Sequence, residues 1–559
     1  MPSKLSSPVS DWYFAFLFFL RQTSLSYHNG LVPSSDRFAI ADFPESWGYW
    51  SCLTLTDIPL EDDRPVAGKE DGKPEQPLKW WQLSLLGVAC TIGTGYFLGS
   101  GVGLRIGGPS FLFAFALAAA GTYAVYDALA KMTAAEPAKG SFRTYAKRAF
   151  GRWAGFSVGW VYGCSELLIM GSQLTALSLF TRLWLPGWPM WTFAAAYASL
   201  ALLVMLTGTK GFERLEHLFA VVKLSAIALF LVLAGLALFG TFGGGARPPA
   251  FPATSAALFP AGALGTWSSL IFAFYAFGGI EIMGLMANRL RNPEEAPKAG
   301  RFMLGTLAVL YAGSIALVVT LVAPGTFPEK QSPFAVALGG FGLPYVPHAF
   351  NAILIVAGFS TMIASMFAVT GMIVTLAEDR DAPRPFARRM GRRRIPVLAL
   401  ALTTGGMAAS VTAAFLIPES VYVVVTTAAG LMLLYNWLFI LLSAGRLVRP
   451  SGPFRAIRYT GLAAIVLAVA GTTLHPTSRP GFFVSLAFAA AIGLVALIMR
   501  KRWKRSEAGS AGGVRAAFVP DWNPRLRVSF LAEQSSESFQ PEVGAEDEKR
   551  QPGHDRDDR

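Results

Sequence analysis

Charged residues are scarce in this sequence. Asp, Glu, Lys and Arg make up only 15% of its 559 residues, whereas an average soluble domain has about 25%. The apolar residues AVILMFWYC account for 53% of the chain. A soluble chain of this length would form several domains, and so few charges could not cover their surfaces. The composition therefore argues against a cytosolic enzyme and favours a polytopic membrane protein.

Residues that bind metals or form disulfides are also rare. The three cysteines, Cys52, Cys90 and Cys164, form no CxxC pair, and the five histidines are scattered along the chain. This pattern predicts neither a disulfide framework nor a metal site, and nothing in the sequence indicates a cofactor. No HExxH motif is present, and we do not expect an enzyme.

Twelve apolar stretches are long enough to cross a bilayer, which takes about 20 residues. Because backbone groups in lipid must be satisfied within the segment, we expect all twelve to be helices. We number these predicted spans in chain order: 82–105, 109–131, 153–182, 190–208, 215–240, 264–287, 302–323, 346–377, 396–417, 420–445, 458–474 and 481–499.

The linkers between these spans alternate in charge. Those after spans two, four, six, eight and ten carry clusters of Lys and Arg, and the alternate linkers hold almost none. Basic loops stay in the cytoplasm, so we expect a multi-pass protein of the cell membrane with both termini cytoplasmic. The formal net charge is +13, but this arrangement indicates that the partner is the lipid bilayer and not a nucleic acid.

The predicted membrane domain covers residues 78–500. Residues 1–77 are polar, and their one apolar run, 12–20, is too short to span a bilayer. We expect them to form a disordered cytoplasmic region, with a true start near residue 75 as an alternative. Residues 501–559 have mixed charge, and we expect a disordered cytoplasmic tail there.

Span one is interrupted by glycines. The sequence TIGTGYFLGSG at residues 91–101 has four glycines within nine residues, and each costs a helix about 1 kcal/mol relative to alanine. A local break is expected, and its freed N–H groups would suit a carboxylate. Close packing of two helices through small residues is the alternative interpretation.

Span six repeats the feature in FYAFGGIE at residues 274–281, where two glycines precede an acidic residue. Interrupted helices at matching places in two halves of a chain indicate a transporter site. The breaks are five spans apart, which predicts a five-plus-five inverted repeat followed by two extra spans. Carbonyl groups of span six could receive an ammonium group, and Phe274 and Phe277 could close over a substrate side chain.

Ionisable residues within spans are costly and are therefore functional candidates. Lys223 in span five is either a proton-exchanging ammonium group or a side chain that snorkels to the membrane surface. Glu166 in span three is a proton site, a partner for a substrate cation or a buried structural group. The same alternatives hold for Glu281, which lies beside the break in span six.

These features resemble those of the bacterial amino acid permeases, which belong to the amino acid, polyamine and organocation (APC) superfamily. The resemblance covers about residues 78 to 500 and is carried by the two breaks together with GPS at 108–110, AKGSFRTYA at 138–146, GFSVGW at 155–160, QLTA at 173–176 and NPE at 292–294. It implies an all-α polytopic membrane protein with twelve transmembrane helices, a five-plus-five inverted repeat, broken helices 1 and 6, and alternating access.

The resemblance also implies the roles of individual residues. The substrate carboxylate would be held by the backbone of Ile92, Gly93, Thr94 and Gly95. The substrate amino group would be held by the segment containing Phe274, Ala276, Phe277, Gly278 and Gly279. The lysine matching Lys223 stands, in relatives, where sodium-coupled transporters place a cation, which implies proton coupling at Lys223 with contributions from Glu166 and Glu281.

The sequence departs from the family pattern at several positions. The family usually has Glu where Gln173 stands, and an apolar or aromatic residue where Glu166 stands. These changes leave the backbone cradle intact and the identity of the substrate open. The sequence therefore predicts a secondary active transporter that imports an amino acid, by proton symport. A non-transporting amino acid sensor with a permease fold is the alternative, and symport versus exchange and the oligomeric state stay open.

Overall fold

The computed structural model describes residues 77–510, apart from gaps at 241–250, 324–326, 328–330, 341, 343–344, 392, 417–420 and 450. Across these residues the chain is helical, and its extended segments form only two isolated bridges. The prediction of an all-α protein is confirmed for this part of the chain. Residues 1–76 of the predicted N-terminal region and residues 511–559 of the predicted tail lie outside the described residues.

Each of the twelve predicted spans is helical where it is described. Span one is divided among α2 (Trp80–Thr91), α3 (Thr94–Phe97) and α4 (Gly99–Gly107), and span six between α11 (Gly262–Tyr275) and α12 (Ile280–Met286). The other ten are α5 (Phe111–Ala135), α7 (Arg152–Arg182), α8 (Met190–Met205), α9 (Thr209–Leu238), α13 (Ala296–Leu321), α15 (Val346–Glu378), α16 (Val397–Leu416), α17 (Val421–Leu447), α18 (Gly452–Gly471) and α19 (Arg479–Ser510).

Short helices and turns lie in the connections between these spans. They are α6 (Phe142–Phe150), α10 (Ser255–Leu258), α14 (Pro333–Gly339) and the 3-10 turns η1 (Gly108–Ser110), η2 (Ala287–Arg289), η3 (Pro293–Glu295) and η4 (Arg384–Ala387).

Membrane-crossing length is met by nine helical segments among the described residues, while α8 and the part Val397–Thr412 of α16 are shorter apolar segments. Spans one and two count together there, because the segment Thr94–Ala135 runs through α3, α4 and α5 without a long interruption. The 12 residues of α2 are too few to cross a bilayer alone. The chain is thus a multi-pass membrane protein.

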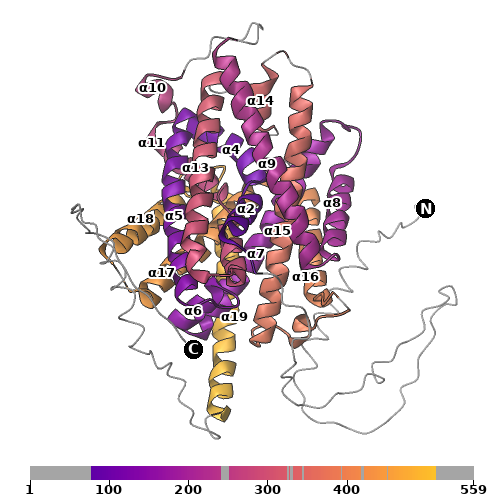
Figure 1. Cartoon of the computed structure of the whole chain (residues 1–559), viewed down its shortest axis with the longest axis vertical. Helices are drawn as coiled ribbons and strands as arrows, with labels where there is room; N and C mark the ends of the chain where they lie inside the picture. Colours follow the sequence, from indigo (N-terminus) through magenta and orange to yellow (C-terminus); the bar gives the residue numbers. More distant parts are fainter. Residues whose placement is uncertain are drawn as a thin grey trace, which may run out of the picture. The chain divides into compact units, whose positions relative to one another are not determined.

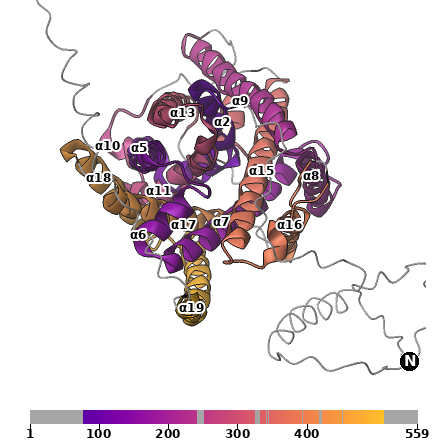
Figure 2. The ribbon, with the colours of Figure 1, turned by 60° about the horizontal axis from the view of Figure 1, so that its bottom comes forward.

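The broken helices lie inside the bundle. The apolar window of span six is 89% buried within the protein, whereas that of α19 is only 17% buried. The helix α2 packs against α9, α12, α13 and α15, and α11 packs against α4, α5, α17 and α18. The helix α19 lies at the periphery (Figure 2). The breaks therefore face other helices and not lipid, which is where irregular backbone is tolerated in a membrane.

The basic linkers meet at one end of the bundle, which we call the basic end. There Arg446 donates to the carbonyl of Ala149, and Arg393 to that of Leu206. The helix α6 lies at this end, which is the lower one in Figure 1, and α10 and α14 lie at the opposite end. The two ends of the bundle can therefore be distinguished by their content of basic residues.

The helix α19 continues past the predicted end of the membrane domain. It runs to Ser510, whereas the sequence predicts a disordered tail from residue 501. The indole of Trp503 explains the difference in part, because it is buried against Phe156 and the guanidinium of Arg152 lies 5.2 Å from its ring centre. Residues 501–510 therefore extend the last helix.

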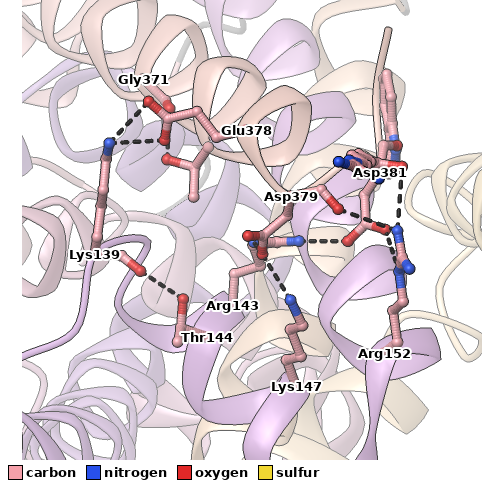
Figure 3. Close-up of polar contacts among 12 residues, drawn as sticks. Lys139, Arg143, Thr144, Lys147, Arg152, Gly371, Glu378, Asp379 and Asp381 are labelled. Atoms are coloured by element: carbon pink, nitrogen blue, oxygen red, sulfur yellow. Dashed lines mark hydrogen bonds and ion pairs between the residues drawn. The ribbon is translucent and has the colours of Figure 1, made fainter. Parts of the chain in front are cut away.

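Ion pairs join the residues directly after α15 to α6 and to the first residue of α7 (Figure 3). The enclosed guanidinium of Arg143 contacts both Asp379 and Asp381, Lys147 lies 2.9 Å from Asp379, and Arg152 lies 2.8 Å from Asp381. We call these five residues the linker clamp. Burial acts to raise the pKa of Asp379, but hydrogen bonds from Lys147 and Arg143 outweigh it and hold the pKa below its usual range.

Candidate functional site

The first helix break lies where the glycines predict it. The helix α2 ends at Thr91, Ile92 and Gly93 are extended, with Gly93 at φ −153° and ψ −159°, and the helix resumes at Thr94. The first N–H groups of any helix have no partner within the helix. Those of Thr94 and Gly95 therefore point out of the start of α3, with the positive end of a helix dipole behind them.

The second break needs glycine for two reasons. Gly279 has φ +108°, a conformation that side chains with a Cβ rarely adopt. A Cβ at this position would also lie 2.6 Å from the carbonyl oxygen of Cys90 in α2. The breaks of spans one and six are therefore in direct contact, although they are almost 190 residues apart in the sequence.

A small cavity lies at this contact. Its volume is about 30 Å³, and it is lined by Cys90, Thr91, Gly93, Thr94, Gly95, Glu166, Ile169, Gln173, Tyr275, Gly278, Gly279, Ile282, Thr361 and Ser365. One water needs about 10–15 Å³, so the cavity has room for one or two waters. It must widen before it can hold an amino acid.

The predicted substrate residues divide into two groups. Gly93, Thr94, Gly95, Gly278 and Gly279 line the cavity. The other four are buried elsewhere and do not line it: Ile92, Phe274, Ala276 and Phe277.

The aromatic residues of span six differ from the prediction. Phe274 packs against Trp437, with ring centres 6.1 Å apart, and Phe277 packs against Tyr311 at 5.3 Å. Neither ring closes over the cavity, and Tyr275 lines it instead. Residues three apart share a helix face while the residue between them points elsewhere, and the glycine pattern does not reveal which face is inward.

One wall of the cavity is rich in hydrogen-bond acceptors. Glu166 and Gln173 lie two turns apart on α7 and both line the cavity. Among the described residues, the Oε1 atom of Gln173 and the hydroxyl of Thr94 are buried without a partner. A buried polar group without a partner is costly, so these atoms are available to a bound molecule.

Glu281 lies behind the break and not in the cavity wall. Its carboxylate accepts a hydrogen bond from the backbone N–H of Gly279 at 3.0 Å and one from the indole of Trp437 at 3.3 Å. It is also close enough to Glu166 for the two carboxyl groups to interact. The structure thus brings together two of the three predicted ionisable residues.

Lys223 is fully buried in the middle of α9. Its ammonium group donates a hydrogen bond to the carbonyl oxygen of Ala89 at 2.5 Å, in the last turn of α2 before the break. Cys90, the next residue, lines the cavity. The snorkelling alternative is therefore wrong, because the side chain reaches the interior of the bundle and not its surface.

The arrangement of two broken helices around a cavity agrees with a match to a protein family. The model of the amino acid permease family matches residues 82–499 of the chain. The chain belongs to the amino acid permease family. It is thus a bacterial-type amino acid transporter of the APC superfamily and not an enzyme.

Named relatives of the permease are bacterial transporters. It is 50% identical over 430 residues to an uncharacterized transporter of Bacillus subtilis, YcgH, which covers 77% of this chain and 96% of that protein. It is 32% identical over 377 residues to the aromatic amino acid transport protein AroP of Corynebacterium glutamicum, covering 66% and 80%. It is 28% identical over 372 residues to the gamma-aminobutyric acid permease of Bacillus subtilis, covering 66% and 79%.

The sequence interpretation missed one buried acidic residue of the permease. Glu216 lies two turns before Lys223 on α9 and is fully buried. The hydroxyl of Ser360 donates to its Oε2 atom at 2.8 Å, and its Oε1 atom has no partner among the described residues. The seven-residue spacing from Lys223 is a signal, but the polar sequence FERLEH around it resembles a span end.

A larger cavity of the permease opens at the basic end, and we call it the vestibule. Its volume is about 350 Å³, and its lining includes Phe212, Phe367, Arg389, Arg393 and Arg394. Ile282 of α12 lines both the vestibule and the small cavity. The vestibule and the small cavity therefore share this side chain in their linings.

The opposite side of the small cavity is covered by aromatic rings. Tyr96 in α3 stacks on Tyr311 with ring centres 3.9 Å apart, and Phe334 in α14 lies 4.9 Å from Tyr96. Phe334 and Tyr96 are buried. Buried aromatic side chains therefore lie between the small cavity and the end that carries α14.

Proposed function

We propose that the permease imports an amino acid across the cell membrane by proton symport and binds it at the two contacting helix breaks. The proposal rests on the contact between the start of α12 and the last turn of α2, which lies beside the small cavity. Transporter sites are built from such half-helices near the membrane midplane.

The two breaks offer complementary groups to an amino acid. The N–H groups at the start of α3 suit the carboxylate of the substrate, because they are hydrogen-bond donors at a positive helix end. The carbonyls of Phe274 and Tyr275 at the end of α11 already accept hydrogen bonds from the turn that follows. The carbonyl of Ala276 accepts from Tyr311 and that of Gly279 from Ile282. The carbonyl of Gly278, beside the cavity, is therefore assigned to the ammonium group of the substrate.

Proton coupling is assigned to Lys223. Its ammonium group, on α9, donates a hydrogen bond to the carbonyl of Ala89 in α2, the helix that ends at the first break. Protonation would strengthen this bond and loss of the proton would weaken it, so the position of α2 would depend on the proton. Glu166 and Glu281 are assigned a contributing role because they interact beside the same cavity.

The proposed topology has twelve crossings, a five-plus-five inverted repeat and both termini in the cytoplasm. Two breaks in spans one and six agree with the repeat. The linkers rich in Lys and Arg meet at the basic end, which we assign to the cytoplasm by the positive-inside rule. The vestibule would then be the cytoplasmic exit of the transport path.

The test is uptake by the purified permease in proteoliposomes. Labelled amino acids, including aromatic, branched, basic and acidic ones and gamma-aminobutyrate, are added with and without an inward proton gradient. We expect accumulation of at least one amino acid that collapses when a protonophore removes the gradient. Uptake that ends at equal concentrations on both sides, with or without the gradient, would contradict proton symport.

Closing the first break should abolish transport. A Cβ at Gly93 would lie 2.5 Å from the hydroxyl of Thr361, and one at Gly95 would lie 2.9 Å from the ring of Tyr275. We expect Gly93→Val and Gly95→Val to insert into the membrane but to lose measurable uptake, because the branched side chain occupies the cavity. Gly305→Val is the matched control, since nothing lies within 4 Å of a Cβ there. Near-normal uptake by either cavity variant would contradict the assignment.

A further inference from the structure

We propose that Glu216 accepts the proton of Lys223 and passes it to the vestibule. This inference rests on the proton symport proposed above. It is carried by the order of groups along α9, by the unpartnered carboxylate oxygen and by the surroundings of both side chains.

The groups lie in a line along one helix. Phe212 lines the vestibule, Glu216 follows one turn later, and Lys223 follows two turns after that. At 1.5 Å per residue these steps are about 6 Å and about 10.5 Å along the axis. Long side chains in a helix lean toward its N-terminus. By this rule Lys223 would approach Glu216 and Glu216 would approach the vestibule. In this structure the ammonium group contacts the carbonyl of Ala89, so the transfer requires it to turn from that carbonyl toward Glu216.

The carboxyl group of Glu216 is prepared to accept a proton. Ser360 of α15 holds its Oε2 atom by a hydrogen bond of 2.8 Å, which fixes the group in place. Its Oε1 atom is buried and has no partner among the described residues. Buried carboxylate oxygens normally have hydrogen-bond donors. Protonation at Oε1 would remove the negative charge that this oxygen holds without a donor.

The charged surroundings favour exchange between these two groups. The titratable groups that interact with Glu216 are Lys223 on its own helix and Cys90 on α2, while α15 contributes the hydroxyl of Ser360. When the ammonium group of Lys223 gives a proton to the carboxylate, an amine and a carboxylic acid are formed. The pair has zero net charge before and after this step, so no net charge is added to the apolar interior.

Release from Glu216 leads toward the vestibule. The rings of Phe212 and Phe367 stack in parallel with centres 4.3 Å apart and both line that cavity. Glu216 has no exposure to solvent, and Phe212 lies one turn before it on α9, between its backbone position and the vestibule. When the rings part, the carboxylic acid gives its proton to water in the vestibule, and the arginines there disfavour its return.

The experiment compares two activities of the same proteoliposomes. One is exchange of labelled for unlabelled amino acid at equal pH on both sides, and the other is uptake driven by an inward proton gradient. We expect Glu216→Gln to keep exchange and to slow gradient-driven uptake by about 100-fold. Glu216→Asp, which keeps a titratable group, should restore part of the driven uptake and shift its dependence on internal pH. Glu294→Gln, at an exposed position, is the matched control.

Each outcome decides the proposal. Driven uptake by Glu216→Gln at the wild-type rate overturns the relay and leaves proton symport standing. Equal loss of exchange and driven uptake in both Glu216 variants also overturns it, because the residue would then be structural. If the wild-type permease shows no response to the proton gradient, symport fails first and the relay falls with it. Loss of driven uptake with retained exchange supports the relay.

Discussion

Lys223→Ala is expected to abolish amino acid accumulation driven by a proton gradient while substrate exchange continues. The variant loses both the group proposed to carry the proton and its hydrogen bond to the carbonyl of Ala89. Lys223 does not line the cavity, so the groups proposed to hold the amino acid stay in place. The measurement is uptake against a concentration gradient at several external pH values, compared with substrate binding to the same variant in detergent.

A second variant separates charge from packing at this position. Lys223 is fully buried, and truncation to alanine leaves a cavity, which by itself destabilises a protein. Lys223→Met keeps most of the volume without the charge, and we expect it to lose driven accumulation as alanine does. Wild-type pH dependence in Lys223→Met would make the lysine a packing residue. Glu166→Gln in the same assay would then test the next candidate.

Local glycine chemistry explains why the breaks could be predicted. Clusters of glycine weaken a helix wherever they occur, so the interruptions at residues 92–93 and 276–279 follow from the sequence alone. A lysine in an apolar span can likewise be recognised as a functional candidate from the sequence, because ionisable residues are rare there. Whether it is buried or snorkels is decided by the structure. These features depend on the residues themselves and hardly on what packs against them.

The missed features depend on rotation and on distant contacts. Tyr275 and not Phe274 faces the cavity because of how α11 is rotated against α2 and α7, which no spacing in one helix reveals. Glu216 becomes a candidate only when Ser360, about 140 residues away, is placed beside it. The aromatic cover similarly requires α14, a short helix in a connection where the sequence predicts no helix.

The linker clamp ties some helices of the bundle together and includes no residue of the helices that carry the breaks. It ties the end of α15 to α6 and to the start of α7, and α7 and α15 provide one wall of the small cavity. The helices α2 and α12, which carry the breaks, have no member in the clamp. Alternating access requires one part of the protein to move against another. The clamp therefore joins α6, α7 and α15 into one unit, and under the alternating access that the family resemblance implies we expect α2 and α12 to move against it.

Arg143→Met is expected to lower the free energy of unfolding by about 3–5 kcal/mol, because it removes one partner of a buried ion pair. The side chains of Arg143 and Asp381 are both fully enclosed, so Asp381 would keep only Arg152, whose side chain is 25% exposed, as a charge partner. Thermal unfolding of the purified protein in detergent measures the loss. The double variant Arg143→Met with Asp381→Leu should recover much of it, since an apolar pair can replace a buried ion pair.

The matched control for this prediction is Lys139→Met. Lys139 pairs with Glu378 at 2.7 Å, but its side chain is 62% exposed, and an exposed pair contributes about 0–1 kcal/mol. Equal unfolding temperatures for Arg143→Met and Lys139→Met would show that the buried clamp adds no more than an exposed ion pair.

The clamp should also weaken in acid. Because the pKa of Asp379 is held below its usual range, its contribution to stability is present above the ordinary Asp pKa and is lost as the pH falls through the lowered value.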